Sequence, residues 1–320
     1  MALATDIAEN VLLANALRTD QADLVDGSNL DALAGARLYG LFGPVELGGY
    51  AADLPTACAV IEQLASGCLT TTLVWMQHHG LVGSLLTGPA ALRDRLLADL
   101  CTGARRSGIV FTGLIPGPSP LEATRRDGGW ALDGSAPWVS GWGRIDVLQI
   151  AARSPDDTVV TIALDDLDRP GLVAHRHRLA ALDASGTVRL DFAGLQIDDA
   201  EVISVVAHDP AAAGGQRLRL NGSLALGVAR RCCALIGPSP LDDELNAVRD
   251  QLDRAGDDGI ADARAAAALF ANRAATRLVV TTGSRALDAD RHAQRLMREA
   301  MFLLVFGSRP AIKSALLDRL

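Results

Sequence analysis

The sequence predicts an α+β protein in which helices at both ends of the chain flank a central antiparallel β-barrel. Residues 1–106 are rich in Ala and Leu, and their apolar residues recur at helical spacing. Residues 107–212 contain short apolar runs separated by turn sequences, which is typical of a small antiparallel barrel or sandwich. Residues 213–320 return to the helical pattern. We expect three domains with these bounds, because this order differs from the strand–helix alternation of a doubly wound sheet.

Helices are expected in the second half of the N-terminal segment. Asp53 precedes Leu54-Pro55 as an N-cap before a first-turn proline, and it predicts a helix that ends near Ser66. Two further helices are predicted over Thr70–Leu86 and Pro89–Leu100. In the C-terminal segment the same periodicity predicts helices at residues 217–236, 242–254, 260–287 and 290–305.

The central segment is expected to be built from short strands. Examples lie at residues 108–112, 130–132, 147–152, 158–164 and 187–192. Turn sequences such as Asp127-Gly128-Gly129 separate them. His175 and His177 are two residues apart, as on one face of a strand, but arginines flank them. We therefore expect an exposed basic edge there and no metal site.

Charge and composition exclude several classes of protein. Of the 320 residues 49% are hydrophobic, so the chain can bury a sizeable core. The net charge of -8 offers no basic excess for neutralising phosphates, which argues against nucleic-acid binding. Apolar runs such as Met301–Phe306 are far shorter than the ~20 residues that span a bilayer. Met1–Asn15 lacks the basic region of a signal peptide, so we expect a cytoplasmic protein without membrane contact.

Generic motifs assign no chemistry to the chain. It contains neither a glycine-rich dinucleotide loop nor a phosphate loop. The adjacent His78 and His79 point about 100° apart on a helix and lack a third ligand, so helix packing is favoured over metal binding. The five cysteines form no CxxC pair, and Cys232-Cys233 lies in an apolar run, which favours buried reduced thiols.

Four segments are nevertheless informative when they are compared with known families in their order along the chain. They are Leu38–Tyr50 (LYGLFGPVELGGY), Gly129–Gly143 with Trp138-Val139-Ser140-Gly141 inside it, Leu224–Arg230 (LALGVAR) and Gln294–Ala300 (QRLMREA). Each resembles a segment of the acyl-CoA dehydrogenase family of flavoproteins, and together they extend over nearly the whole chain. The resemblance implies the fold of that family, which is an N-terminal helical domain, a central β-barrel and a C-terminal four-helix bundle, here shortened.

The resemblance also implies FAD, held between the barrel and the bundle. In that family a glutamate removes the α-proton of an acyl thioester while the β-hydrogen leaves as hydride to the flavin. Trp138 is expected to lie against the isoalloxazine ring, and the Ser140 hydroxyl to bond near its reactive edge. The alternative is that Trp138 fills the barrel and Ser140 is an ordinary strand residue. Arg298, in the segment similar to "eRlyRDa", is expected to have a structural or cofactor-side role.

Two cofactor elements depart from the family pattern. Leu114–Pro120 stands in place of the "TEPgAGSD" loop, where Pro116 and Gly117 match but the side chains that contact flavin and thioester are missing. Pro116 remains a candidate cofactor contact through its backbone. No arginine–phenylalanine–glycine motif follows Ile236, and Gly283 is a candidate remnant of the segment that reaches the cofactor of a neighbouring subunit.

The catalytic base is the largest departure. Phe306 stands where the glutamate of the family is expected, directly before Gly307. Members that carry the base on an earlier bundle helix would have it at the position of Arg217. Neither a phenylalanine nor a protonated arginine can accept a proton from carbon. Glu299 carries a carboxylate that is a candidate substitute for the base. The favoured interpretation is a partly buried charge at a helix end, so the catalytic residue is unknown.

Three functions remain open from the sequence. The chain is an acyl-CoA dehydrogenase with an unrecognised base, a catalytically incomplete subunit whose homologous partner supplies the glutamate, or a flavin monooxygenase or oxidase on the same fold. A structural homologue without FAD is a further alternative. An incomplete subunit is slightly favoured. The substrate is expected to be an acyl thioester of CoA or a carrier protein, and a homo- or hetero-oligomer is expected to form through the C-terminal bundle.

Overall fold

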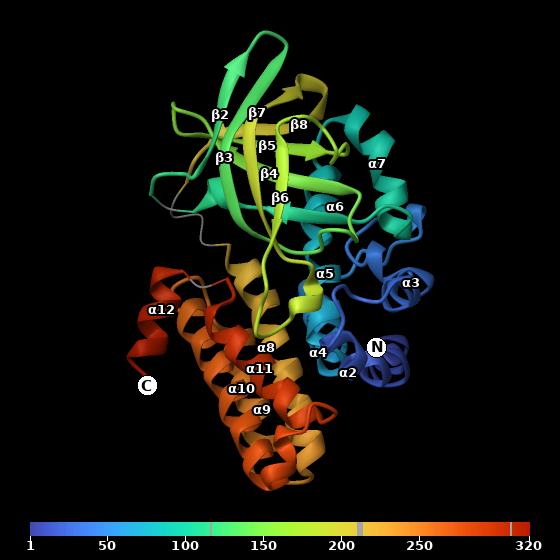
Figure 1. The fold of residues 1–320 in the computed structure, drawn as a ribbon, viewed down its shortest axis with the longest axis vertical. Coiled ribbons are helices and arrows are strands. Elements are labelled where there is room, and N and C mark those ends of the chain that lie inside the picture. The colour runs from blue at the N-terminus through green and yellow to red at the C-terminus, as the bar shows by residue number, and fades with distance from the viewer. Residues whose placement is uncertain (116, 210–213, 308) are drawn as a thin grey trace.

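A computed structural model describes residues 1–115, 117–209, 214–307 and 309–320 of the chain. Helices come first, strands second and helices last, as expected (Figure 1). In Figure 1 the strands lie above the C-terminal helices, and the N-terminal helices run along one side of both. Pro116 lies outside the described residues. The expected domain boundary after residue 106 falls between α7 and β1, and the division into independent domains stays a prediction.

The N-terminal segment is helical almost throughout. Its elements are α1 (Ala2–Ile7), η1 (Ala8–Leu13), α2 (Ala14–Asp20), α3 (Gly27–Gly35), η2 (Leu38–Gly40), η3 (Val45–Leu47), α4 (Leu54–Gly67), α5 (Leu69–Gln77), α6 (His79–Leu86) and α7 (Ala90–Thr102). The Asp53 carboxylate caps α4 by accepting a hydrogen bond from the Thr56 amide, which confirms the predicted start. The single helix expected over Thr70–Leu86 is divided into α5 and α6 at His78.

The strands form one curved sheet of eight strands. They are β1 (Ser107–Val110), β2 (Leu121–Arg126), β3 (Gly129–Val139), β4 (Val147–Arg153), β5 (Thr158–Leu164), β6 (Leu172–Arg176), β7 (Val188–Asp198) and β8 (Val202–Ala207), with the short helices η4 (Thr112–Leu114), η5 (Asp183–Ser185) and η6 (Asp199–Glu201) between them. The order is β6-β7-β3-β2-β4-β5-β8, with β1 on β4. Most pairs are antiparallel, as expected, but β1 and β2 meet β4 in parallel.

The C-terminal segment contains the expected four-helix bundle. Its elements are α8 (Gly215–Ile236), α9 (Leu241–Arg254), α10 (Ile260–Thr282), η7 (Gly283–Leu287), α11 (His292–Val305) and α12 (Pro310–Leu317). The helix predicted to reach residue 287 ends at Thr282, because Gly283 has a positive φ of 71° and leaves the helical path. No helix in the described part of the chain is long and apolar enough to cross a membrane.

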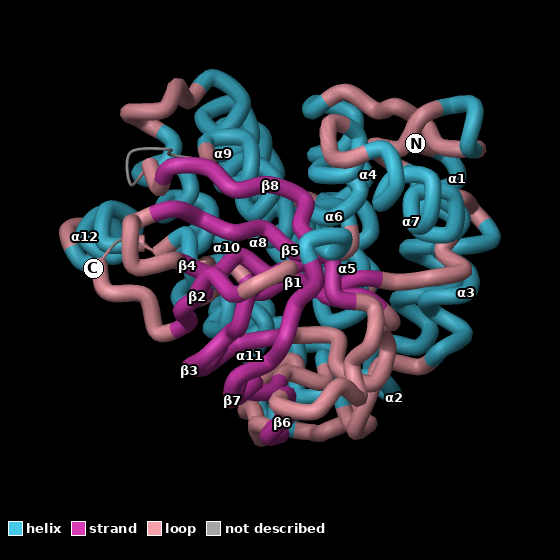
Figure 2. Tube along the Cα trace, turned by 90° about the horizontal axis from the view of Figure 1, so that it is seen from above, coloured by secondary structure: helices cyan, strands magenta, loops and turns pink. Residues whose placement is uncertain are grey.

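Apolar clusters hold the three groups of elements together, and one of them packs α6 and α7 against the sheet through Leu85, Leu96 and Val147. One large apolar cluster joins the N-terminal helices to the bundle, because α4 packs directly against α8. A second cluster fills the inside of the sheet, where Leu121, Leu132, Ile150 and Leu190 are fully buried. Seen from above, α3, α4, α6 and α7 lie to one side of the strands, whereas α8, α10 and α11 lie behind the strands (Figure 2). The end of the sheet that faces the bundle is therefore where the barrel, the N-terminal helices and the bundle meet.

Candidate cofactor and substrate site

Trp138 and Ser140 lie at the end of β3. They flank Val139, whose side chain is fully buried, so both point away from the core of the sheet. The Trp138 indole is 65% exposed, which contradicts the alternative that it fills the barrel. The Ser140 hydroxyl lies 2.8 Å from Thr187 Oγ1, which in turn lies 2.7 Å from Ser185 Oγ. An exposed indole beside a chain of hydroxyl groups is the kind of surface that a flat, polar-edged ring can cover.

His177 supports Trp138 from behind. Its imidazole stacks on the indole with centroids 4.5 Å apart and planes at 22°, and its Nε2 donates to the Pro137 carbonyl at 2.7 Å. The sequence analysis placed His175 and His177 on an exposed basic edge. β6 is indeed an edge strand, and His175 pairs with Asp191 at 3.0 Å. The role of His177 was missed because its stacking partner is far away in the sequence.

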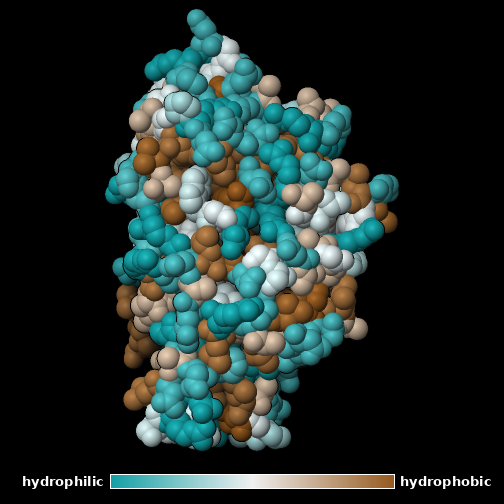
Figure 3. Space-filling model, turned by 45° about the vertical axis from the view of Figure 1, so that its right-hand side comes forward, coloured by the Kyte–Doolittle hydropathy of each residue, from teal (hydrophilic) through white to brown (hydrophobic). Residues whose placement is uncertain are grey.

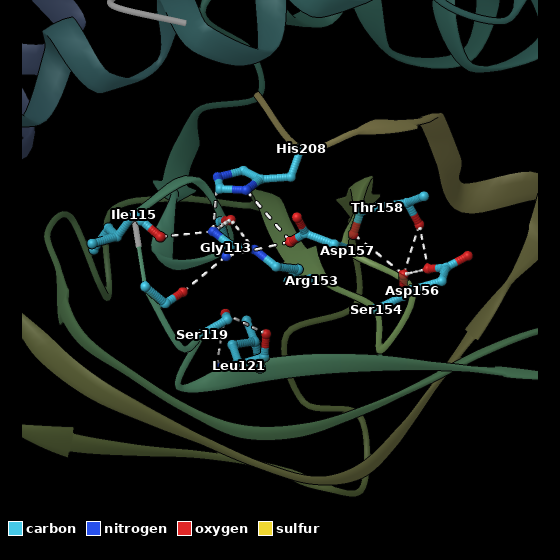
Figure 4. Close-up of polar contacts among 11 residues, drawn as sticks. Gly113, Ile115, Ser119, Leu121, Arg153, Ser154, Asp156, Asp157, Thr158 and His208 are labelled. Atoms are coloured by element: carbon cyan, nitrogen blue, oxygen red, sulfur yellow. Dashed lines mark hydrogen bonds and ion pairs between the residues drawn. The ribbon is translucent and has the colours of Figure 1, made fainter. Parts of the chain in front are cut away.

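Arg153 holds the loop that takes the place of the family's flavin loop. Its guanidinium donates to the carbonyl oxygens of Gly113 (2.7 and 3.1 Å), Ile115 (2.6 Å) and Gly117 (2.9 Å), and it contacts His208 Nε2 at 2.9 Å (Figure 4). Charge-assisted bonds of this kind offset the cost of burying the guanidinium. The loop is thus organised through its backbone, and no sequence motif pointed to Arg153.

The loop and β1 each lie next to β3. The Ser135 amide donates to the Pro120 carbonyl at 2.8 Å, which sets the end of the loop beside the part of β3 that leads to Trp138. On the other side, a Cβ on Gly108 of β1 would lie 3.3 Å from the Ser140 carbonyl oxygen. Phe111 lies three residues after Gly108, which is about 10 Å along an extended chain. We call this surface, from Trp138 and Ser140 to Phe111, the barrel wall.

Of the two expected base positions, Arg217 lies above Phe111, and the residue after Phe306 approaches the next turn of α8. The Arg217 guanidinium, near the start of α8, lies 4.8 Å above the Phe111 ring. Phe306 stacks on Phe302 at 5.2 Å, and a Cβ on the following Gly307 would lie 3.0 Å from Asn221 Nδ2, one turn along α8 from Arg217. Among the described residues no carboxylate forms a hydrogen bond or ion pair with Arg217. A shared role of the two positions at a substrate stays a prediction, and neither side chain is a base.

Glu299 does not take the place of the missing base. It lies in the middle of α11 and is fully buried, which corrects the expectation of a partly buried charge at a helix end. Its Oε1 pairs with Arg295 Nη1 at 2.5 Å inside the core, and burial raises its pKa. The carboxylate therefore serves a buried ion pair.

Arg298 lies in the middle of α11, and Gly283 precedes that helix. The Arg298 guanidinium binds Asp20 of α2, Gln294 of its own helix and the Ala180 carbonyl at 3.1 Å, so it ties together three parts of the chain. Gly283 precedes α11 and Phe306 follows it, so a helix of 14 residues, about 20 Å long, separates them. A contact between Gly283 and the cofactor of a neighbouring subunit stays a prediction.

The described surface also contains a cavity of about 660 Å³ that is not part of the barrel wall. Arg126, Trp130 and Arg169 are among its lining residues, which sets it at the Gly129 end of β3, remote from Trp138. Trp138 stands nine residues further along the same strand, roughly 30 Å away. The candidate site is therefore defined by exposed and unpaired groups at the barrel wall and not by this cavity.

Comparisons with known proteins agree with this geometry. Residues 1–104 match the family model described as "Acyl-CoA dehydrogenase, N-terminal domain". The chain is 30% identical over 213 residues to benzylmalonyl-CoA dehydrogenase of Aromatoleum aromaticum, which covers 62% of this chain and 55% of that protein. It is 27% identical over 248 residues to 3-sulfinopropanoyl-CoA desulfinase of Advenella mimigardefordensis, covering 71% of this chain and 61% of that protein.

The fold comparison extends over the whole chain. The structure of butyryl-CoA dehydrogenase from Megasphaera elsdenii superimposes with a TM-score of 0.85 at 17% identity, covering 99% of this chain and 94% of that one. The sequence matches cover less than the fold match does. The chain spans less than two thirds of the length of the two curated relatives named above. The N-terminal segment therefore matches the N-terminal domain of the acyl-CoA dehydrogenases, and the whole chain has the fold of the acyl-CoA dehydrogenase structure compared with it.

Proposed function

We propose that this chain is an acyl-CoA dehydrogenase-like flavoprotein that binds FAD at the barrel wall and acts on the CH–CH bond of an acyl thioester. The chain is incomplete as a catalyst by itself, and a homologous partner supplies the proton-accepting carboxylate. The observation that carries the proposal is the exposed Trp138 indole, backed by His177 and beside the Ser140 hydroxyl.

The residues present fit one side of a flavin. A bound FAD would supply a hydride acceptor at this site. Trp138 offers an aromatic face whose rear is already occupied by His177, so its free face is available to a second ring. Ser140 offers a hydroxyl at the edge of that face, and its bond to Thr187 fixes the position of the oxygen. The loop held by Arg153 closes the wall beside them.

The proposal of incompleteness rests on the residues around Phe306. Removal of an α-proton requires a group that can accept it within hydrogen-bond reach. The contacts described around Phe306 and Arg217 are with Phe302, Asn221, Phe111 and Arg309. One carboxylate, Asp257, lies beside the backbone of Gly215 at the start of α8, yet it forms no ion pair with Arg217.

The first test is a titration of the purified chain with FAD, followed by absorption between roughly 350 and 500 nm. We expect flavin bands at stoichiometric occupancy. Because aromatic contacts are worth about 0.5–1.5 kcal/mol, Trp138→Ala should weaken FAD binding by up to about tenfold, and Ser140→Ala should weaken it less. Ser314→Ala, on the exposed face of α12, is the matched control and should bind FAD like the wild type.

The outcomes separate the alternatives. A colourless chain that does not bind FAD contradicts the proposal and favours the alternative of a structural homologue without FAD. A flavin-loaded chain that butyryl-CoA bleaches without air and without a partner is a complete dehydrogenase, which contradicts the proposed incompleteness. A loaded chain that stays yellow with the thioester but bleaches when a catalytic homologue is added supports the proposal.

A further inference from the structure

Two arginines converge at the point where the family carries its base. Arg217 comes from the start of α8, and Arg309 comes from the segment between α11 and α12. A Cβ on Gly214 would lie 3.4 Å from Arg309 Nη2 and 3.8 Å from Arg217 Nη2. The two guanidinium groups therefore stand against the same point of the backbone.

Arg217 has no anionic partner within the described chain. It makes no hydrogen bond or ion pair there, and its contact is the face of Phe111 at 4.8 Å. Arg219, two residues along the same helix, shows the contrast, because it binds the Asp253 carboxylate at 2.6 Å. The Arg217 side chain is exposed, so its guanidinium is accessible to a ligand. A negative group that binds here would meet a cation that holds no carboxylate of the described chain.

The position of Arg217 relates it to a substrate on the barrel wall. Phe111, under its guanidinium, is three residues from Gly108, which abuts the Ser140 carbonyl. Phe306 and Gly307 approach the next turn of α8 from the other side. A group bound here would sit beside the reacting part of a thioester and far from its nucleotide end. A fixed cation cannot accept a proton from carbon, but it can bind an oxyanion.

We propose that Arg217, assisted by Arg309, binds an oxyanion carried by the acyl group, so that the preferred substrates are acyl thioesters with a carboxylate or similar anionic group close to the thioester. This inference rests on the proposed function, because it assumes that the thioester lies along the barrel wall. Arg217 is a specificity-determining residue that holds the anionic group, while Phe111 and Phe306 border the site with apolar rings.

The test compares two four-carbon probes, succinyl-CoA and butyryl-CoA, with free CoA as a third arm. Their affinities for the FAD-loaded chain are measured by calorimetry, so that no turnover is needed. We expect the wild type to bind succinyl-CoA at least about tenfold more tightly than butyryl-CoA. Arg217→Gln should erase this preference and leave the affinity for butyryl-CoA within about twofold, and Arg217→Lys should retain part of it. Arg230→Gln, on the same helix but away from the wall, is the control and should keep the full preference.

Each other result overturns the assignment in an identifiable way. Equal affinities for the two acyl-CoA probes in the wild type, or a preference that survives in Arg217→Gln, would show that no acyl oxyanion is bound by Arg217. An equal loss of all three ligands in Arg217→Gln would assign the arginine to the CoA phosphates. If the wild type binds neither acyl-CoA, the proposed function itself fails. Binding of butyryl-CoA without a preference leaves that function standing and removes only this inference.

Discussion

At the scale of single residues, Arg153 organises a loop whose own side chains make few polar contacts. Ser119 is the loop residue whose side chain bonds, and it bonds to Leu121 in its own segment. Of the three carbonyl groups held by Arg153, that of Gly113 belongs to a buried residue, whereas Ile115 and Gly117 are exposed. A lysine could not replace this cation, because a compact ammonium cannot span three acceptors as a planar guanidinium does.

Replacement of Arg153 should release the loop. Because the loop carbonyls, that of buried Gly113 among them, would lose charge-assisted partners, Arg153→Gln should lower the free energy of unfolding by about 2–4 kcal/mol. Hydrogen exchange should rise in peptides that cover residues 111–121, with smaller changes in the bundle helices. Arg126→Gln, an exposed arginine on β2, is the control and should leave exchange in the loop unaltered. Unaltered loop exchange in Arg153→Gln would show that the loop keeps its conformation without the guanidinium.

At the scale of elements, His78 joins three of them. It stands at the break between α5 and α6, its Nε2 donates to the Leu100 carbonyl at the end of α7, and its Nδ1 accepts from the Ser107 amide at the start of β1. Both ring nitrogens are therefore used in the neutral form. Protonation of Nδ1 would remove the acceptor of the Ser107 bond. The junction between the N-terminal helices and the sheet depends on a neutral imidazole.

This arrangement predicts a loss of stability in acid. Burial lowers the pKa of His78 to about 3, while an unfolded histidine titrates near 6.5. Below pH 6.5 the unfolded chain binds more protons than the folded chain, so stability falls as pH falls, by up to about 1.4 kcal/mol per pH unit for this group. Urea unfolding at pH 6.5, 5.5 and 5.0 measures the slope. In His78→Gln the slope of stability against pH should fall by the contribution of this one imidazole. A slope remains in the variant, because burial also lowers the pKa of His79.

The control for this prediction is His175→Gln, on the exposed edge strand β6. That variant should retain the wild-type dependence on pH, because its imidazole is exposed beside Asp191 and does not join elements. An equal slope in wild type and His78→Gln would mean that the buried imidazole accepts its proton without unfolding. The comparison of slopes is informative even where the substitution lowers stability at every pH.

Elements were predictable where local pattern determines them. The Asp53 cap, the long bundle helices and the central strands β4 and β5 follow from periodicity and turn residues. The strands β2, β6 and β8 did not, because their outer faces carry exposed and charged residues and their pairing is non-local. At the site, Trp138 and Ser140 are identified by a family motif, whereas His177 and Arg153 act through contacts between distant segments. Such contacts leave no short signature in the sequence.

At the scale of the whole molecule, the bundle exposes apolar side chains that a partner would cover. Met301 and Val305 lie one turn apart on α11 and are both exposed, and Leu317 is exposed on α12. On the face shown in Figure 3, hydrophobic residues appear as brown patches among hydrophilic ones, also along the lower part where the bundle lies. Single exposed apolar residues are ordinary on protein surfaces, so the oligomeric state must be measured.

We predict that the bundle mediates assembly. Light scattering on the purified chain should give at least twice the protomer mass of 33.5 kDa, and Met301→Glu with Val305→Glu should return it to the protomer mass, because two buried carboxylates would lose hydration at the interface. Val173→Glu, equally exposed but on β6, should leave the assembly intact. A wild-type chain that is monomeric at micromolar concentration would contradict self-assembly. In that case the apolar face of α11 would be free to bind a different chain. Because the described site lacks a base, that chain should be a homologue that brings a carboxylate to Phe306 across this same face.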